Sequence, residues 1–208
     1  MRRSRLPRGL LPEVAVTASR PGGRSARVRG QVLAAVLELL ARDGLRGLRY
    51  EEVAELAGVH KTSVYRRWPT RDALVAEALS DFAERNAPLP DTGDLRADLV
   101  EYLCALGAVA GSPQGRALNA LRWAGISEEG ELRELLRGVW AGRLESLQRR
   151  LDRAVADGQL PWADAELLDG PLSGAVHQRA RLGGEFTRAR AELLVDVVLA
   201  GIRAVPRS

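Results

Sequence analysis

Apolar residues recur every three or four positions along most of this 208-residue chain, which is the spacing of one face of an α-helix. The first such stripe predicts a helix from about Ser25 to Asp43 that ends at Gly44, a residue suited to a left-handed cap. Its members are Val28, Val32, Leu33, Val36, Leu39 and Leu40. Alternation typical of strands is rare and helix formers dominate, so the pattern predicts an all-α protein of about nine helices.

Three more helices are predicted before residue 86. Two brief apolar patterns predict helices over Tyr50–Ala57 and Lys61–Trp68, and Pro69 then breaks the chain. Thr70 is placed to cap a longer helix that opens with Arg71. Together with the first helix, these elements form the first of two predicted parts, residues 25–86.

The second predicted part spans residues 87–208 and begins after a hinge. Residues 86–93, NAPLPDTG, hold two prolines and several turn-forming residues. Amphipathic patterns beyond them predict helices over about 94–110, 113–124, 128–157, 163–182 and 187–205. By contrast, residues 1–24 mix Arg, Pro and Gly without a helical period, which predicts a disordered basic N-terminal extension.

The stretch VAELAGVHKTSVYRRW, residues 53–68, is the most informative in the chain. Ala54 is small enough to let two helices cross closely, Gly58 permits a tight turn between them, and Val64 fills the junction. The second helix presents hydrogen-bond donors outward. They are Lys61, Thr62, Ser63, Arg66 and Arg67. A helix with donors and positive charge on its outer face suits the major groove of double-stranded DNA.

Basic residues are concentrated at the front of the chain. Residues 1–75 hold 15 basic and 7 acidic side chains, whereas residues 76–208 hold 16 basic and 20 acidic ones. This asymmetry indicates that the front meets a polyanion. The alternative is a basic tail that only keeps the protein in solution. The arginines of the N-terminal extension either add nonspecific or minor-groove contacts or have no role.

Over about residues 28–75 the chain resembles the TetR family of bacterial transcription regulators. The resemblance rests on Gly44, Val53, Ala54, Ala57, Gly58, Val59, Tyr65, Trp68, Arg71 and Leu74. It implies an N-terminal three-helix helix-turn-helix DNA-binding domain over residues 25–86, which includes a fourth, linking helix. It also implies a larger C-terminal helical domain over residues 87–208 that binds a ligand and dimerises.

Two positions depart from the family pattern. The family usually places Ser or Thr immediately before its second and third helices, where a hydroxyl caps the helix. Arg49 and His60 stand in those places here, and each loses a cap worth about 1 kcal/mol. Arg49 could instead reach a phosphate, and His60 could do the same or remain an ordinary surface residue.

The expected contacts with DNA divide between phosphates and bases. Tyr65, through the resemblance, and Arg71, at the start of the fourth helix, are expected at phosphates. The full predicted set is Arg49, His60, Lys61, Thr62, Ser63, Tyr65, Arg66, Arg67 and Arg71. One short helix reads only a few base pairs, so specific binding implies a homodimer on an inverted-repeat operator.

The last two helices are the predicted dimer surface, since two helices from each subunit form a four-helix bundle in the family. Small and apolar residues at helical spacing define this surface. They are Gly170, Gly174, Leu194, Val197, Val198 and Gly201. The alternative is that this stripe belongs to the core of a single subunit.

The resemblance further implies a repressor that releases DNA when a small hydrophobic molecule enters the C-terminal domain. The candidate lining residues are Tyr102, Leu106, Trp123, Trp140 and His177. Each of them could instead be an ordinary core residue. Two other functions stay open, namely a ligand-independent DNA-binding protein and an activator.

The sequence gives no indication of catalysis, a metal or a cofactor. His60 and His177 are the only histidines and are far apart, and no glycine-rich phosphate loop follows a strand. Cys104 stands alone, which excludes an intramolecular disulfide and is typical of a small buried hydrophobe. No apolar run reaches about 18 residues, so we expect no membrane span and a cytoplasmic protein.

Overall fold

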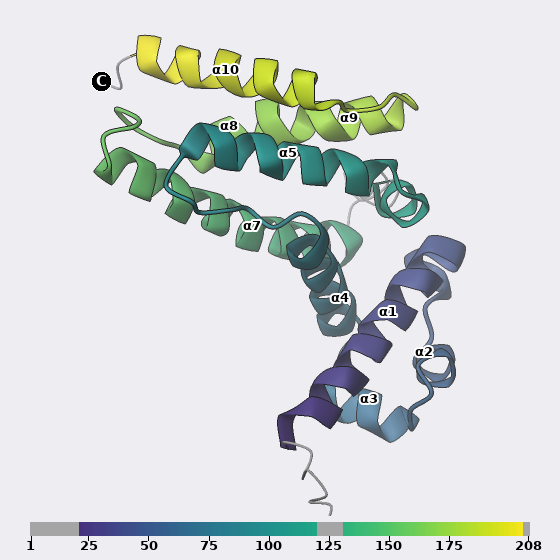
Figure 1. Cartoon of the computed structure of the whole chain (residues 1–208). Helices are drawn as coiled ribbons and strands as arrows, with labels where there is room; N and C mark the ends of the chain where they lie inside the picture. The colour runs from purple at the N-terminus through teal and green to yellow at the C-terminus, as the bar shows by residue number, and fades with distance from the viewer. Residues whose placement is uncertain (1–20, 120–130, 206–208) are drawn as a thin grey trace, which may run out of the picture.

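The computed structural model describes residues 21–119 and 131–205, and all regular structure in these ranges is helical (Figure 1). The first group of helices is α1 (Pro21–Gly47), α2 (Tyr50–Leu56), α3 (Lys61–Arg67) and α4 (Arg71–Asn86). The second group is α5 (Leu95–Gly111), a helical segment over 113–119, α7 (Glu131–Ala156), α8 (Ala165–Asp169), α9 (Ala175–Arg181) and α10 (Arg188–Ala204). A π-helical turn, η1 (Gly170–Gly174), joins α8 to α9. The all-α prediction is confirmed within the described residues.

Helix α1 begins earlier than the sequence pattern predicts. Its first residue is Pro21, and residues 21–24 therefore belong to this helix rather than to the predicted extension. Proline is favoured in the first turn of a helix, because the N–H that it lacks has no helical partner there. Gly44 interrupts the regular helix, as predicted, with a positive φ of 69° that favours glycine. Its ψ of −174° differs from that of the left-handed cap that the sequence predicts, and the helical assignment continues to Gly47. The rest of the predicted extension, residues 1–20, lies outside the described residues.

The first hydrophobic core joins α1 to α4. The predicted stripe of α1 is buried, and so are Ala54 of α2, Val64 of α3 and Leu74 of α4. Gly58 links α2 to α3 with a φ of 64°, a conformation in which a side chain is strained. Trp68, directly after α3, is only 2% exposed and belongs to the same core. These positions agree with the junction predicted from the sequence.

Helix caps follow the sequence in part. The hydroxyl of Thr70 accepts a hydrogen bond from the backbone N–H of Ala73 at 3.2 Å, which confirms the predicted cap of α4. Arg49 and His60 make no capping hydrogen bond at the starts of α2 and α3, as their side chains predict. The short helices α2 and α3 are therefore held by packing rather than by their caps.

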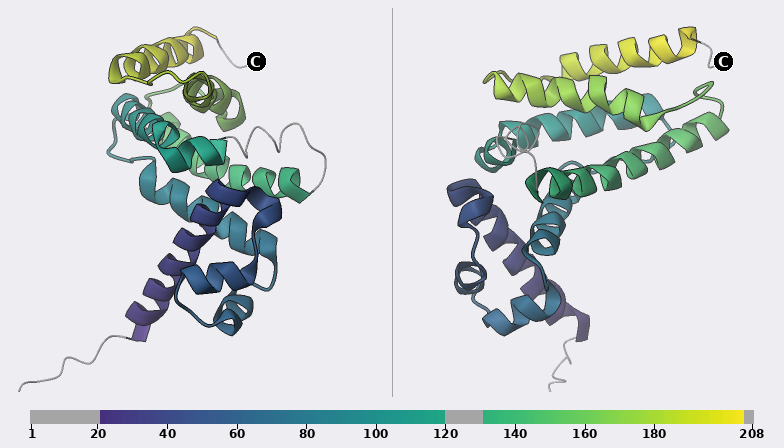
Figure 2. Two further views of the ribbon diagram at one scale, coloured as in Figure 1. Left: turned by 90° about the vertical axis from the view of Figure 1, so that its right-hand side faces the viewer. Right: turned by 180° about the vertical axis from the view of Figure 1, so that it is seen from behind.

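The second core lies around α5, which has α7 on one side and the layer of α9 and α10 on the other (Figures 1 and 2). Leu99 and Leu103 of α5 are fully buried, as are Leu151 of α7, Leu172 of η1 and Val195 of α10. Helix α4 runs between the two groups and packs against both α1 and α7. A displacement of α4 would therefore change the packing of both cores.

A buried ion pair fixes α7 to α5. The Nη2 and Nε atoms of Arg150 lie 2.6 Å and 2.8 Å from Oδ2 of Asp98, and the two residues are 3% and 1% exposed. Thr92 also donates its backbone N–H and its hydroxyl to Asp98. Burial alone would raise the pKa of Asp98, but the hydrogen bonds from Thr92 and Arg150 bring it below its ordinary value. Among the described residues, no helix is both long and apolar enough to cross a bilayer.

Candidate functional site

Helix α3 lies at the end of the molecule that is farthest from α10 (Figure 1). Lys61, Thr62 and Arg66 are exposed on its outer face, and Ser63 is half-buried. Val64 turns inward and is fully buried. The structure thus brings together, on one short helix, the side chains predicted to enter a DNA groove.

Tyr65 is held by an aromatic contact that the sequence pattern did not reveal. Its ring stacks on that of Tyr50, with 4.3 Å between centroids and 7° between planes. The hydroxyl of Tyr50 donates a hydrogen bond to the backbone oxygen of Trp68 at 2.9 Å. Tyr65 is nevertheless 44% exposed, so its ring is positioned while its edge stays accessible. Tyr50 is therefore a positioning residue, which only the tertiary structure identifies.

Arg67 differs from the other basic residues of α3. Its Nη1 donates a hydrogen bond to the hydroxyl of Ser25 at 3.2 Å, and its guanidinium lies 5.4 Å from the centre of the Trp68 ring. The side chain is exposed but is directed toward α1 rather than toward the side of Lys61 and Arg66. Consecutive residues of an α-helix point about 100° apart, so Arg67 faces a different direction from Arg66.

The remaining predicted DNA contacts lie at the starts of helices. Arg49 and His60 are exposed immediately before α2 and α3. Arg71 is half-buried in the first turn of α4, and its charge acts on the hydroxyl of Tyr50. Burial raises the pKa of Tyr50 despite the nearby Arg71. These placements fit residues that could meet an anion at the edge of the α3 surface.

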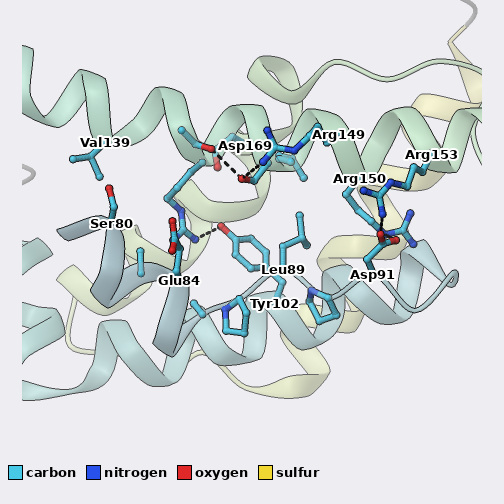
Figure 3. Close-up of a pocket in the computed structure, with 18 residues that line it drawn as sticks. Ser80, Glu84, Leu89, Asp91, Tyr102, Val139, Arg149, Arg150, Arg153 and Asp169 are labelled. Carbon is cyan, nitrogen blue, oxygen red and sulfur yellow. Dashed lines mark hydrogen bonds and ion pairs between the residues drawn. The ribbon is translucent and has the colours of Figure 1, made fainter. Parts of the chain in front are cut away.

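Two neighbouring cavities lie between α4, α5 and α7. The larger, of about 390 Å³, is lined by the end of α4, by residues 87–91 and by one face of α7 (Figure 3). The smaller, of about 150 Å³, has mainly apolar walls, among them Leu79, Phe82 and Val109. Both cavities are bordered by Ala83, Ala87, Val139 and Arg143.

Four of the five predicted ligand-binding residues line these cavities. Tyr102 lines the larger one, while Leu106, Trp140 and His177 line the smaller one. Trp123 lies outside the described residues. The sequence pattern did not indicate the polar wall of the larger cavity, where Arg143 and Arg150 of α7 border the space. Arginines at these spacings on an amphipathic helix look like ordinary solvated residues.

The residues of the predicted dimer surface differ in their exposure in the single subunit. Val197 is 61% exposed, Gly170 and Gly201 are exposed, and Gly174 is half-buried. Leu194 and Val198 instead pack partly against the core of their own subunit, as the alternative of an intramolecular stripe required. Three leucines on α8, on α10 and directly after α9 are exposed as well. They are Leu167 at 59%, Leu182 at 66% and Leu193 at 66%.

The described ranges contain no group of three or more His, Cys, Asp or Glu side chains that could hold a metal ion. Cys104 is half-buried on α5, and burial raises the pKa of its thiol. A protonated, partly covered thiol is a poor nucleophile.

Comparisons with known proteins match both halves of the chain to the same family. A family model described as bacterial regulatory proteins of the tetR family matches residues 32–78, and one described as a tetracyclin repressor-like C-terminal domain matches residues 89–198. The chain is 30% identical over 181 residues to the HTH-type transcriptional regulator AqdR of Rhodococcus erythropolis, covering 86% of each protein.

Two further relatives cover most of the chain. The DNA-binding transcriptional repressor TetR of Mycobacteroides abscessus is 31% identical over 170 residues, which covers 81% of this chain and 90% of that protein. The crystal structure of the TetR family transcription regulator SCO0332 superimposes with a TM-score of 0.66 and 35% identity, covering 85% of this chain and 98% of that one.

Proposed function

Because this chain belongs to the TetR family of helix-turn-helix transcription regulators, and not to a family of enzymes, we propose that it is a ligand-responsive repressor. In this proposal a homodimer binds an inverted-repeat operator in the cytoplasm and releases it when a small molecule enters the C-terminal half. The observation that carries the proposal is the exposed donor face of α3, with Tyr65 fixed beside it.

Helix α3 is the proposed reading helix. Lys61 and Arg66 are suited to guanine edges, and the methyl group of Thr62 to a thymine methyl. Tyr65 and Arg71 would contact phosphates on either side of the groove and so set the register of the helix. Ser63, Arg49, His60 and Arg67 complete the proposed contact surface at its margins, mainly as positioning contacts.

A homodimer is proposed through α10 and the continuous helix formed by α8, η1 and α9. These elements make the outer layer of the second half, where Leu167, Leu193 and Val197 are exposed (Figure 2). Gly170 and Gly201 leave room for close helix contact. The same apolar surface on two subunits forms a self-complementary interface with two-fold symmetry. Such symmetry would place two copies of α3 on one face of DNA.

Ligand response is proposed to pass through α4. Leu79 and Phe82 of α4 line the smaller cavity, while Leu74 and Val75 of the same helix are buried in the first core. A ligand that favours one position of α4 would thereby favour one spacing of the two reading helices. The two cavities beside α4 support a ligand-responsive regulator over a ligand-independent one.

We propose that the boundary between the DNA-binding part and the ligand-binding part lies at residues 86–87.

Selection from a random pool of double-stranded oligonucleotides tests the proposal. The full chain should enrich sequences that contain an inverted repeat, and fluorescence anisotropy should then give nanomolar affinity for them. Changing Lys61, Thr62 and Arg66 together to alanine should abolish the preference over random DNA. A control with Arg137 and Arg149 changed to alanine removes two exposed charges from α7 and should keep it. Enrichment without a repeat, or none at all, would contradict the proposal.

A further inference from the structure

The larger cavity has an arginine-rich wall that a purely hydrophobic ligand would leave unused. Four arginines of α7 border it, namely Arg143, Arg149, Arg150 and Arg153. We propose that the two cavities together bind an amphipathic organic anion, with its carboxylate at Arg143 and its apolar body in the smaller cavity. This inference rests on the proposed function, since it names the chemical class of the effector.

Arg143 is the arginine best placed to receive a carboxylate. It borders both cavities, is half-buried and donates from Nη2 to the hydroxyl oxygen of Tyr102 at 2.5 Å. Its guanidinium also lies 5.4 Å from the centre of the Tyr102 ring. Within residues 21–119 and 131–205 it makes no ion pair with an acid. A guanidinium carries five N–H donors, so the Tyr102 contact leaves capacity for a bidentate carboxylate.

The acidic residues that line the larger cavity differ in whether they already pair with a neighbouring side chain. Asp91 is paired with Arg150 and Arg153, and Asp169 accepts a hydrogen bond from the indole of Trp140 at 3.1 Å. Glu84 of α4 is exposed and lies beside Tyr102, which contacts Arg143, while Asp91 lies on the other side of Tyr102 (Figure 3). Glu84 is therefore the acid that opposes an anion at Arg143.

Arg150 supplies a second and independent observation. The residue is only 3% exposed, and its Nη1 is buried without any acceptor, although Nε and Nη2 are bonded to Asp98. It lies seven residues from Arg143, which is two turns or roughly 10 Å along α7. The wall that α7 contributes thus contains four arginines, and one buried guanidinium nitrogen among them lacks an acceptor. A ligand rich in acceptors would offer these arginines hydrogen-bond partners.

The smaller cavity determines the rest of the ligand. Its walls include Leu79, Phe82, Leu106, Val109 and Trp140, and it shares Arg143 with the larger cavity. An aliphatic or aromatic group buried there would be stabilised by its removal from water. The ligand class is therefore a carboxylate attached to an apolar body, and neither a polar sugar nor an organic cation.

Isothermal titration calorimetry on the full chain without DNA tests this class directly. The probes are octanoate, octan-1-ol and octylammonium, together with 2-naphthoate and 2-naphthylmethanol. We expect at least one carboxylate to bind at least about tenfold more tightly than its matched alcohol, and octylammonium not to bind. Arg143→Gln should abolish the preference for the anion. Glu84→Gln should tighten carboxylate binding several-fold. Arg137→Gln, an exposed α7 control that is paired with Glu134 and lines neither cavity, should change little.

Several results would overturn the inference. These are equal binding of acid and alcohol, no binding of either acid at millimolar concentration, or an unchanged preference in Arg143→Gln. If Arg143→Gln fails to fold, weaker or unchanged binding to Glu84→Gln also contradicts the inference. DNA release is measured separately on the selected operator. Release of DNA by an uncharged compound alone would support the proposed function but reject the anionic ligand. Anion binding that does not release DNA would support the anionic ligand but reject the proposed ligand response.

Discussion

The indole Nε1 of Trp68 donates a hydrogen bond of 2.6 Å to Oε2 of Glu77, and this contact joins the end of α3 to α4. The other oxygen of the same carboxylate accepts from Nε of Arg29 on α1 at 2.5 Å. One side chain of α4 therefore contacts both the end of α3 and α1. Two residues later, Leu79 of the same helix lines the smaller cavity. In the proposed ligand response, Glu77 would therefore transmit a shift of α4 to α3.

Glu77→Ala should destabilise the protein and weaken DNA binding. The substitution leaves the Trp68 donor without its acceptor in a part-buried site, which costs about 1–3 kcal/mol in the free energy of unfolding. Urea unfolding followed by tryptophan fluorescence measures this loss. Glu55→Ala, at an exposed site on α2, is the control and should lie within about 0.5 kcal/mol of the parent. Equal midpoints for the two variants would contradict the proposed role of Glu77.

Arg66 and Arg67 should behave differently although they are adjacent. Arg66→Ala should weaken operator binding by about 1–3 kcal/mol and relax the sequence preference, since Arg66 faces the proposed groove. Arg67→Ala should weaken operator binding much less, because its guanidinium is engaged with Ser25 and Trp68. Fluorescence anisotropy with the selected operator and with single-base variants measures both effects. A larger loss of specificity in Arg67→Ala would reverse the assignment.

The elements of the first half could be predicted from the sequence because their signals are local. Gly44 requires a positive φ, Thr70 caps α4, and the apolar stripe of α1 needs only its own spacing. The stacking of Tyr65 on Tyr50 could not be predicted in this way. It joins residues of different helices, and nothing in the spacing of two tyrosines says that their rings meet.

The sequence pattern also could not show which apolar residues of α10 face the core and which are exposed. Leu193, Leu194, Val197 and Val198 form one broad apolar band, in which adjacent residues point about 100° apart. In the structure Leu194 and Val198 pack against the core, while Leu193 and Val197 are left exposed. The role of the arginines that line the larger cavity could not be predicted for a similar reason. It depends on their burial and their ion pairs, and their spacing in the sequence reveals neither.

Val197→Asp should prevent dimerisation and, with it, specific DNA binding. The position is 61% exposed in the single subunit, so an aspartate there should leave the subunit folded. In a self-complementary interface the new charge would appear twice and would be buried without a partner. Sedimentation velocity at micromolar concentration should show a monomer, and operator affinity should fall at least about a hundredfold. Ala156→Asp, at an exposed position on α7, is the matched control and should remain dimeric.

Leu194→Asp separates an interface effect from a folding effect. Leu194 is half-buried against the core of its own subunit, so this variant should lose stability even as a monomer. Val197→Asp should keep the helical circular dichroism signal and the cooperative unfolding of the parent subunit. A monomeric parent protein, or a dimeric Val197→Asp variant, would reject α10 as the dimer surface.

The buried pair of Asp98 and Arg150 should make stability depend on acid pH. The pKa of Asp98 is lower in the folded protein than its ordinary value near 4, because the hydrogen bonds from Thr92 and Arg150 outweigh the effect of burial. The unfolded chain therefore takes up the proton first, so the contribution of Asp98 is complete above about pH 5. It is lost as the pH falls through the folded pKa. Asp98→Asn should remove this pH dependence and should lower the free energy of unfolding at pH 7 by about 3–5 kcal/mol, because the buried Arg150 loses its buried partner and keeps only the longer, more exposed pair with Asp91. Urea unfolding between pH 3 and 7 measures both effects, and Asp196→Asn, in the exposed pair with Arg96, should change stability much less. An unchanged acid slope in Asp98→Asn would show that other carboxylates govern acid unfolding.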